Sequence, residues 1–368
     1  MRFFKTARET LTLRFSEKSG TLRWLDTAVL TQPSERENNF LLVRLLAACL
    51  VILGHSFFLS PKTCTNCTDP VLTITGYASS HIVGVQIFFV LSGFLVHKSL
   101  DTRKGFFSYL EARIRRILPA YLLCIGLMVF PFGAFFSTLP MNDYLQHPET
   151  LNYVLGKWSP WLFSDRLPGV LFSPRELGAS VNGSLWTIPL EASLYLFLGG
   201  LGALGLLKSS RFSTASLSAV FLATLFLLIG GQSEAPTRTM LELSLLFVWG
   251  ALLYSIRGKV PLHPLLLLIL LFLIQSLKGT GYAPYLSALG LGYATLLVGY
   301  TRIPLLPKGM TDASYGIYLY GFSIQQAIAH FFPEMGPYRM SLMAIPLAWV
   351  LGYLSFRCIE SPFLLRSR

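Results

Sequence analysis

The chain has 368 residues, of which 53% are apolar and 13% charged, and its mean hydropathy is +0.56. Soluble domains carry about 25% charged residues, so this composition leaves too little polar surface to coat a water-soluble globule. The formal net charge of +12 would favour nucleic acid as a partner in a soluble protein. No motif of nucleic-acid recognition accompanies this charge. We therefore expect the chain to lie in a lipid bilayer and not to bind nucleic acid.

The first 38 residues carry seven Lys and Arg among acids and contain no apolar run of signal-peptide length. We expect residues 1–38 to form a cytoplasmic N-terminal extension.

Hydropathy then predicts an all-α polytopic integral membrane protein with about ten transmembrane helices, because a span needs about 20 mostly apolar residues. Nine or eleven spans remain open, since the break around Lys278 and Gly279 is weak. The expected spans lie near 39–60, 81–99, 117–137, 183–207, 213–231, 239–256, 262–277, 281–300, 312–332 and 339–358.

Charge predicts the orientation of these spans. With the N-terminus inside, the cytoplasmic segments hold 22 Lys and Arg and the external segments hold 7. This asymmetry follows the positive-inside rule, so we expect both termini in the cytoplasm.

The longest external connection covers about 138–182, and a connection of that length is more often functional than idle. An earlier external loop contains Cys64 and Cys67. A zinc site normally needs four ligands, and no second pair accompanies this one, so we expect no metal and leave a local disulfide open.

The first span contains Arg44 near its cytoplasmic end and His55 near its outer end. Eleven residues are about three helical turns, which places both side chains on one face, about 16 Å apart. Arg44 is also explained by snorkelling and His55 by hydrogen-bonded helix packing. Histidine is nevertheless the side chain best suited to move a proton near neutral pH.

Arg113 and Arg116 precede the third span at positions i and i+3 and therefore share a helix face. A stop-transfer cluster has the same appearance. Two guanidinium groups on one cytoplasmic face also form a clamp for phosphate, so the pair predicts a phosphorylated cytoplasmic ligand.

Glu191 lies about two turns into the fourth span, and ionisable groups inside a bilayer are functional candidates by default. Such a carboxylate can be protonated or paired with Arg for structure alone. Next to His55 it would instead orient and charge-stabilise the imidazole, as in acyl-transfer sites.

Taken together, these stretches resemble the membrane-bound acyltransferase 3 family, the bacterial group that O-acetylates surface polysaccharides and related acceptors. The resemblance runs from about residue 39 to residue 363 and departs from the family at Tyr320, where many relatives have a histidine. The elements that carry it are Arg44 with His55, followed in order by 84–95, 113–121, 183–191, 314–320 and 360–363.

The resemblance implies a bacterial inner-membrane enzyme that moves an acyl group, commonly acetyl, from cytoplasmic acyl-CoA to a hydroxyl of an extracytoplasmic glycan. It implies a transmembrane acyltransferase domain over 39–363 and a short cytoplasmic tail over 364–368. By this resemblance the catalytic residues are His55 and Glu191. The residues expected to bind the acyl-CoA donor are Arg44, Ser92, Gly93, Phe94, Arg113 and Arg116, and those expected to bind the acceptor are Asn182, Trp186 and Tyr315.

Two other readings remain. A proton-coupled transporter or flippase would use His55, Glu191 and Arg44 as a proton relay or anion gate, but no internal repeat supports it. A purely structural membrane subunit would use these polar residues only to pack helices.

Overall fold

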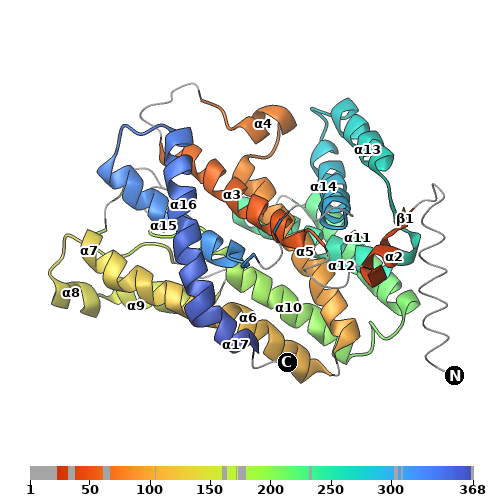
Figure 1. Cartoon of the computed structure of the whole chain (residues 1–368), viewed down its shortest axis with the longest axis horizontal. Helices are drawn as coiled ribbons and strands as arrows, with labels where there is room; N and C mark the ends of the chain where they lie inside the picture. Colours follow the sequence, from red (N-terminus) through yellow and green to blue (C-terminus); the bar gives the residue numbers. More distant parts are fainter. Residues whose placement is uncertain are drawn as a thin grey trace.

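The computed structural model describes residues 23–31, 38–60, 67–103, 105–159, 164–170, 172, 180–231, 234–301, 306–307 and 310–365. Over these residues the chain is almost wholly helical, with one pair of short antiparallel strands (Figure 1). The elements in chain order are β1 (Arg23–Trp24), α2 (Leu25–Thr31), α3 (Phe40–Leu59), α4 (Pro70–Thr75), α5 (Ser80–Thr102), α6 (Phe106–Leu127), the π-helical turn η1 (Met128–Gly133), α7 (Ala134–Phe136), α8 (Met141–Gln146), α9 (Pro148–Gly156), α10 (Thr187–Ala203), α11 (Ser210–Gly230), α12 (Ala235–Ser255), the 3-10 turn η3 (Arg257–Lys259), β2 (Pro261–Leu262), α13 (Pro264–Ser276), α14 (Ala283–Gly299), α15 (Ser314–Phe331), α16 (Pro337–Ser355), the π-helical turn η4 (Phe356–Glu360) and α17 (Ser361–Leu365).

Several helices of the described chain have the length and apolar character of membrane spans. Three shorter apolar helices, α10, α13 and α14, accompany the long ones. The chain is therefore a polytopic helical membrane protein, since a spanning helix satisfies all its backbone hydrogen bonds internally. Each of the ten expected spans overlaps a helix, while the number that cross the bilayer stays a prediction. The helical stretches that are long and apolar enough to cross are Phe40–Leu59, Ser80–Thr102, Phe106–Phe136, Ser210–Gly230 and Pro337–Leu364.

Helix α5 lies at the centre of the bundle, with α3 on one side and α12 on the other (Figure 1). Glycine permits both contacts. A Cβ on Gly54 of α3 would lie 2.3 Å from the backbone nitrogen of His81, and a Cβ on Gly93 of α5 would lie 1.9 Å from the carbonyl oxygen of Phe247 on α12. Small residues at helix crossings allow this close approach of backbones in membrane bundles.

Helices α15 and α16 pack against each other and against α3. The contact between α15 and the outer half of α3 is polar: Gln325 Nε2 donates to the carbonyl oxygen of Ile52 and to Ser56 Oγ, both at 2.7 Å. Hydrogen bonds of this kind hold membrane helices together. They fix α15 beside the turn of α3 that carries His55.

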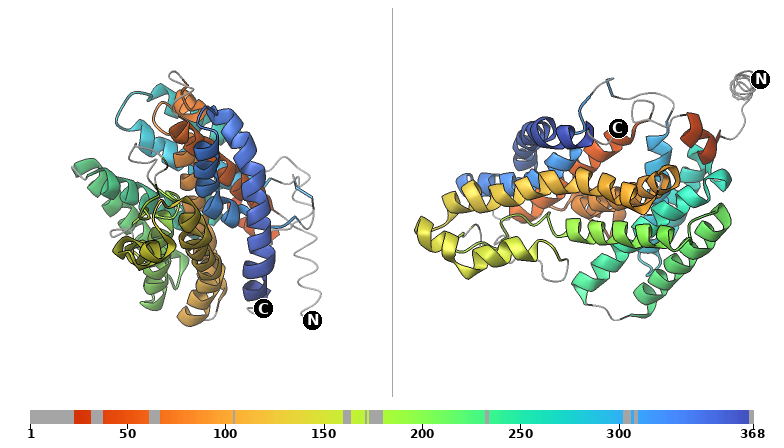
Figure 2. Two further views of the ribbon diagram at one scale, coloured as in Figure 1. Left: turned by 90° about the vertical axis from the view of Figure 1, so that its left-hand side faces the viewer. Right: turned by 90° about the horizontal axis from the view of Figure 1, so that it is seen from below.

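Helix α6 begins at Phe106, eleven residues before the start expected from hydropathy. The helix continues through the basic cluster because arginine has a high helix propensity. Arg113 and Arg116 therefore project from within the helix, and α6 runs alongside α10 (Figure 2, right).

Part of the N-terminal extension packs on the bundle. Strand β1 pairs with β2, and Arg23 donates to the carbonyl oxygen of Tyr300 at 2.7 Å. Arg257 also forms an ion pair with Asp26 of α2 at 2.9 Å. Most of the rest of residues 1–38 lies outside the described residues.

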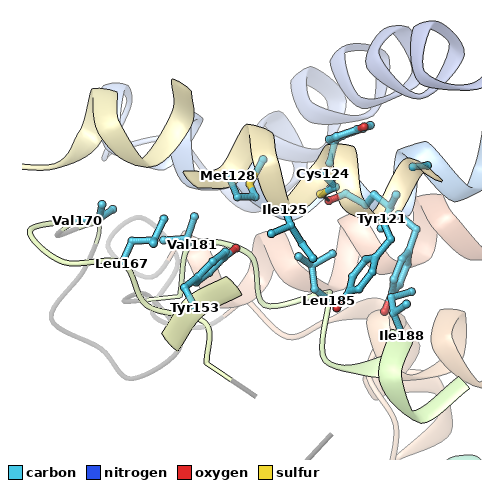
Figure 3. Close-up of a cluster of buried hydrophobic side chains, with 14 of the residues drawn as sticks. Tyr121, Cys124, Ile125, Met128, Tyr153, Leu167, Val170, Val181, Leu185 and Ile188 are labelled. Atoms are coloured by element: carbon cyan, nitrogen blue, oxygen red, sulfur yellow. Dashed lines mark hydrogen bonds between the residues drawn. The ribbon is translucent and has the colours of Figure 1, made fainter. Parts of the chain in front are cut away.

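The connection expected over 138–182 contains the short helices α8 and α9 and ends in buried backbone. Figure 3 shows the apolar cluster beneath it, in which side chains of α6 face Tyr153, Leu167, Val181 and Leu185. The end of this expected external loop is therefore part of the core rather than of a solvated surface.

Candidate active site

A partly open cavity of about 930 Å³ lies between α3, α5, α6, α10 and the segment that enters α15. Six residues predicted from sequence line it, from three different predicted roles: Arg44, Ser92, Arg113, Arg116, Glu191 and Tyr315. Its charged lining is mainly basic, and consists of Arg44, Lys98, Arg103, Arg113 and Arg116 with the acids Glu191 and Asp312.

An acidic residue that the sequence analysis did not single out joins two of the arginines. The Asp312 carboxylate lies 3.2 Å from Arg44 Nη2 and 2.7 Å from Arg116 Nη2. Ser314 Oγ also donates to Asp312 at 2.5 Å, and the Asp312 side chain is only 9% exposed. A buried carboxylate is retained when it is paired and hydrogen-bonded in this way. The sequence signal was a lone acid just before the 314–320 motif.

Arg116 also approaches Glu360 at the end of the last long helix, at 3.6 Å. Helices α3 and α6, the start of α15 and the C-terminal turn η4 thus meet in one network of ion pairs. Two predicted donor residues, Arg44 and Arg116, are engaged by acids of the protein itself.

Arg113 has a different environment from Arg116, one helical turn away. Its guanidinium lies 6.0 Å from the ring centroid of Tyr195, within reach of a cation–π interaction. In the part of the chain that the structure describes, no carboxylate pairs with it, and its Nε is buried without a hydrogen-bond partner. Unlike Arg44 and Arg116, Arg113 therefore lines the cavity without an ion pair to a carboxylate of the described chain.

Glu191 is hydrogen-bonded inside the cavity rather than next to His55. Its Oε1 accepts from Ser92 Oγ and from Tyr195 OH, both at 2.5 Å, and Tyr195 OH lies 3.3 Å from Ser92 Oγ. The expected orientation of His55 by Glu191 is thus not seen among these contacts. The sequence did not reveal the partner because Ser92 lies 99 residues away on another helix.

His55 lies on α3 beside aromatic rings of two other helices. Its ring centroid is 5.1 Å from that of His81 on α5 and 5.0 Å from that of Phe322 on α15. Within the described residues, His55 Nδ1 is buried and has no hydrogen-bond partner. The neighbouring His81 is anchored, since its Nδ1 lies 2.9 Å from Ser79 Oγ. None of these residues lines the cavity.

His81 was missed by the sequence analysis, which placed it in the second span without a role. Its only sequence signal was a histidine at the outer end of an apolar run. The contact with His55 depends on Gly54, the residue before His55, where any side chain would collide with His81.

Two of the predicted donor residues face away from the cavity. Gly93 packs against the backbone of α12, and Phe94 is buried among the rings of Phe40, Tyr254 and Tyr300. Successive residues of a helix point about 100° apart, so Ser92 reaches the cavity while the two residues that follow it pack in the core.

The residues predicted for an acceptor also separate in the structure. Asn182 is fully buried, and its Nδ2 donates to the carbonyl oxygen of Leu319 at 2.7 Å. Trp186 is half-buried against an apolar cluster of α5, α10 and α12. Tyr315 lines the cavity, with its hydroxyl donating to the carbonyl oxygen of Ile117 at 3.1 Å.

The local disulfide that the sequence left open concerns Cys64 and Cys67, of which one is described. Cys67 is disulfide-bonded, and Cys64 lies outside the described residues. Cys49, Cys124 and Cys358 are free thiols.

Comparison with known proteins identifies relatives of the chain. A family model described as an acyltransferase domain, acyltransferase 3, matches residues 38–356. The O-acetyl transferase of Shigella phage Sf6 is 28% identical over 352 residues, covering 90% of this chain and 97% of that protein. The exopolysaccharide production protein ExoZ of Rhizobium meliloti is 30% identical over 312 residues, covering 77% of this chain and 90% of its own. No solved structure matches the chain.

Proposed function

The chain belongs to the acyltransferase 3 family, and on that premise we propose that it transfers an acetyl group from cytoplasmic acyl-CoA to a hydroxyl of an extracytoplasmic glycan. The observation that carries this proposal is the basic cavity within the bundle, whose inner end approaches the helical turns that carry His55 and His81. The name of the phage relative, O-acetyl transferase, supports acetyl, and that of ExoZ supports a polysaccharide acceptor.

We place the enzyme in the bacterial inner membrane with about ten spans and both termini in the cytoplasm. The 22 to 7 distribution of Lys and Arg supports this orientation. It puts the start of α3, the end of α5 and the start of α6 at the cytoplasmic face, together with the basic part of the cavity lining. A donor from the cytoplasm then enters the cavity from its basic side.

The donor phosphates would bind the basic residues that line the cytoplasmic side of the cavity. Arg113 offers a guanidinium that no carboxylate of the described chain neutralises, and Lys98 and Arg103 line the same cavity. Guanidinium groups bind phosphate through short, charge-assisted hydrogen bonds. In this assignment Arg44 and Arg116 hold the cavity wall through Asp312, and Arg113 makes the direct contact.

The chemistry would take place at His55. Its neutral imidazole accepts the proton of the acceptor hydroxyl, and the resulting oxygen nucleophile forms a C–O bond with the acyl carbon while the C–S bond breaks. The thiolate leaves with the electron pair of that bond and takes up a proton, so charge and atoms balance. In a transfer through an acylated His55, a C–N bond to the imidazole forms as the C–S bond breaks, and the acceptor oxygen then forms the C–O bond as that C–N bond breaks.

The test measures thiol release from acetyl-CoA by the protein purified in nanodiscs, with and without extracted surface glycan. We expect glycan-dependent release in wild type and its loss in His55→Ala. His263→Ala is the matched control, because His263 is an exposed residue that caps α13 away from the cavity.

Absence of thiol release from wild type with every acceptor would contradict the proposal. Movement of labelled glycan across vesicles without acyl-CoA would instead favour the transporter reading.

A further inference from the structure

Two aromatic rings line the cavity on the two helices that continue to His81 and to Phe322, the ring neighbours of His55. Phe88 of α5 and Tyr318 of α15 both line it, and their ring centroids lie 5.7 Å apart at an interplanar angle of 71°. Tyr318 is held in place because its hydroxyl donates to the carbonyl oxygen of Ser184 at 2.7 Å and lies 2.5 Å from Thr187 Oγ1. Phe88 has no polar group to anchor it, so its ring is the part of this wall that packing alone positions.

This aromatic contact is on the side of the cavity lining nearest the histidine pair, together with Val85, which lies one turn nearer to His81 on α5. Phe322, whose ring contacts His55, is one helical turn beyond Tyr318 on α15. His81 is seven residues before Phe88 on α5, which is about two turns or 10 Å along the axis. His55, His81 and Phe322 do not line the cavity, whereas Phe88 and Tyr318 do. Both helices thus pass from the cavity wall to the histidine pair within one or two turns.

We propose that Phe88, packed against Tyr318, limits the size of the acyl group that reaches His55. This inference rests on the proposed function, because it assumes an acyl-CoA donor in the cavity. In this inference the acyl end of a donor bound by Arg113 passes beside this aromatic contact on its way to the histidine pair. Because hydrogen bonds hold Tyr318 in place, the volume of the side chain at position 88 decides how many methylene groups of the acyl chain fit beside it.

The experiment compares acetyl-, propionyl- and butyryl-CoA as donors for wild type and Phe88→Ala in nanodiscs, with surface glycan as acceptor. One methylene in an apolar pocket changes kcat/KM by about 10- to 200-fold. We expect the ratio of kcat/KM for butyryl-CoA to that for acetyl-CoA to rise at least about 10-fold in Phe88→Ala.

Phe221→Ala is the matched control. It removes the same ring from a similar aromatic contact, in which Phe221 and Trp249 have ring centroids 5.8 Å apart, but it does not line the cavity. Its donor ratio should equal that of wild type. If Phe221→Ala and Phe88→Ala have the same ratio of kcat/KM for butyryl-CoA to acetyl-CoA, whether raised or unchanged, Phe88 does not limit the size of the acyl group.

Phe88→Leu keeps an apolar contact and replaces Phe88→Ala in the experiment if the alanine variant does not fold. It should shift the ratio in the same direction by about 3-fold or more, and an unchanged ratio would overturn the inference. An active wild type with unchanged variant ratios refutes only this inference. A wild type that releases no thiol from any of the three donors refutes the proposed function as well.

Discussion

The rings of His55 and His81 lie 5.1 Å apart, on two helices that approach each other at Gly54. His55 was expected to have a carboxylate as its partner, and a second imidazole stands beside it instead. A neighbouring imidazole can accept or return a proton, as a carboxylate in an orienting role does not. In the proposed reaction we therefore expect His81 to receive or return the proton that His55 takes from the acceptor hydroxyl.

We expect His81→Ala to lower kcat by about 100-fold, the scale of one general acid–base contribution. KM for acetyl-CoA should stay within about 2-fold of wild type, because His81 does not line the donor cavity. Steady-state thiol release at several acetyl-CoA concentrations separates the two parameters. His263→Ala again provides the histidine control. A variant that changes KM and leaves kcat intact would remove His81 from the reaction.

Arg113→Ala should raise KM for acetyl-CoA by about 10- to 100-fold, because hydrogen bonds to charged groups contribute about 1.5–3 kcal/mol. With S-acetylpantetheine, a donor without phosphates, the same variant should differ little from wild type. Arg115→Ala is the control, since Arg115 forms an exposed ion pair with Glu111 at 2.5 Å and does not line the cavity. Equal losses with both donors would show that Arg113 does not act on phosphate.

Asp312→Asn should destabilise the protein by about 3 kcal/mol, the lower end of the range for breaking a buried pair, because two guanidiniums lose their shared carboxylate. Thermal unfolding in detergent measures the change. Glu242→Gln removes a carboxylate from the exposed pair with Arg238 and should cost less than about 1 kcal/mol. Similar losses in the two variants would show that burial adds nothing to the Asp312 network.

Lys157 makes stability depend on pH. Burial lowers its pKa to about 7, although nearby Asp165 acts in the opposite direction. The unfolded chain, with a lysine pKa of about 10.4, therefore binds more protons than the folded chain between about pH 7 and pH 10. Stability must rise with pH over that window. The unfolding temperature of wild type should rise from pH 7 to pH 9 relative to Lys157→Met, and parallel curves would contradict the assignment.

The sequence by itself located the ten apolar stretches that overlap helices. Hydropathy and charge are local properties, so the ten stretches that became helices were visible without any contact between them. The spacing of Arg113 and Arg116 was local in the same way, and both side chains line one cavity because a helix repeats every 3.6 residues.

Only the tertiary structure decided which polar groups meet. Asp312 lies 268 residues from Arg44 and 196 from Arg116 in sequence, and Glu191 lies 99 residues from Ser92. No periodicity relates residues on different helices, because helix crossing and rotation depend on how small residues and side chains pack. Gly54 illustrates this: as a letter it is an ordinary glycine in an apolar span, and only the crossing with α5 makes it the position that brings His81 to His55.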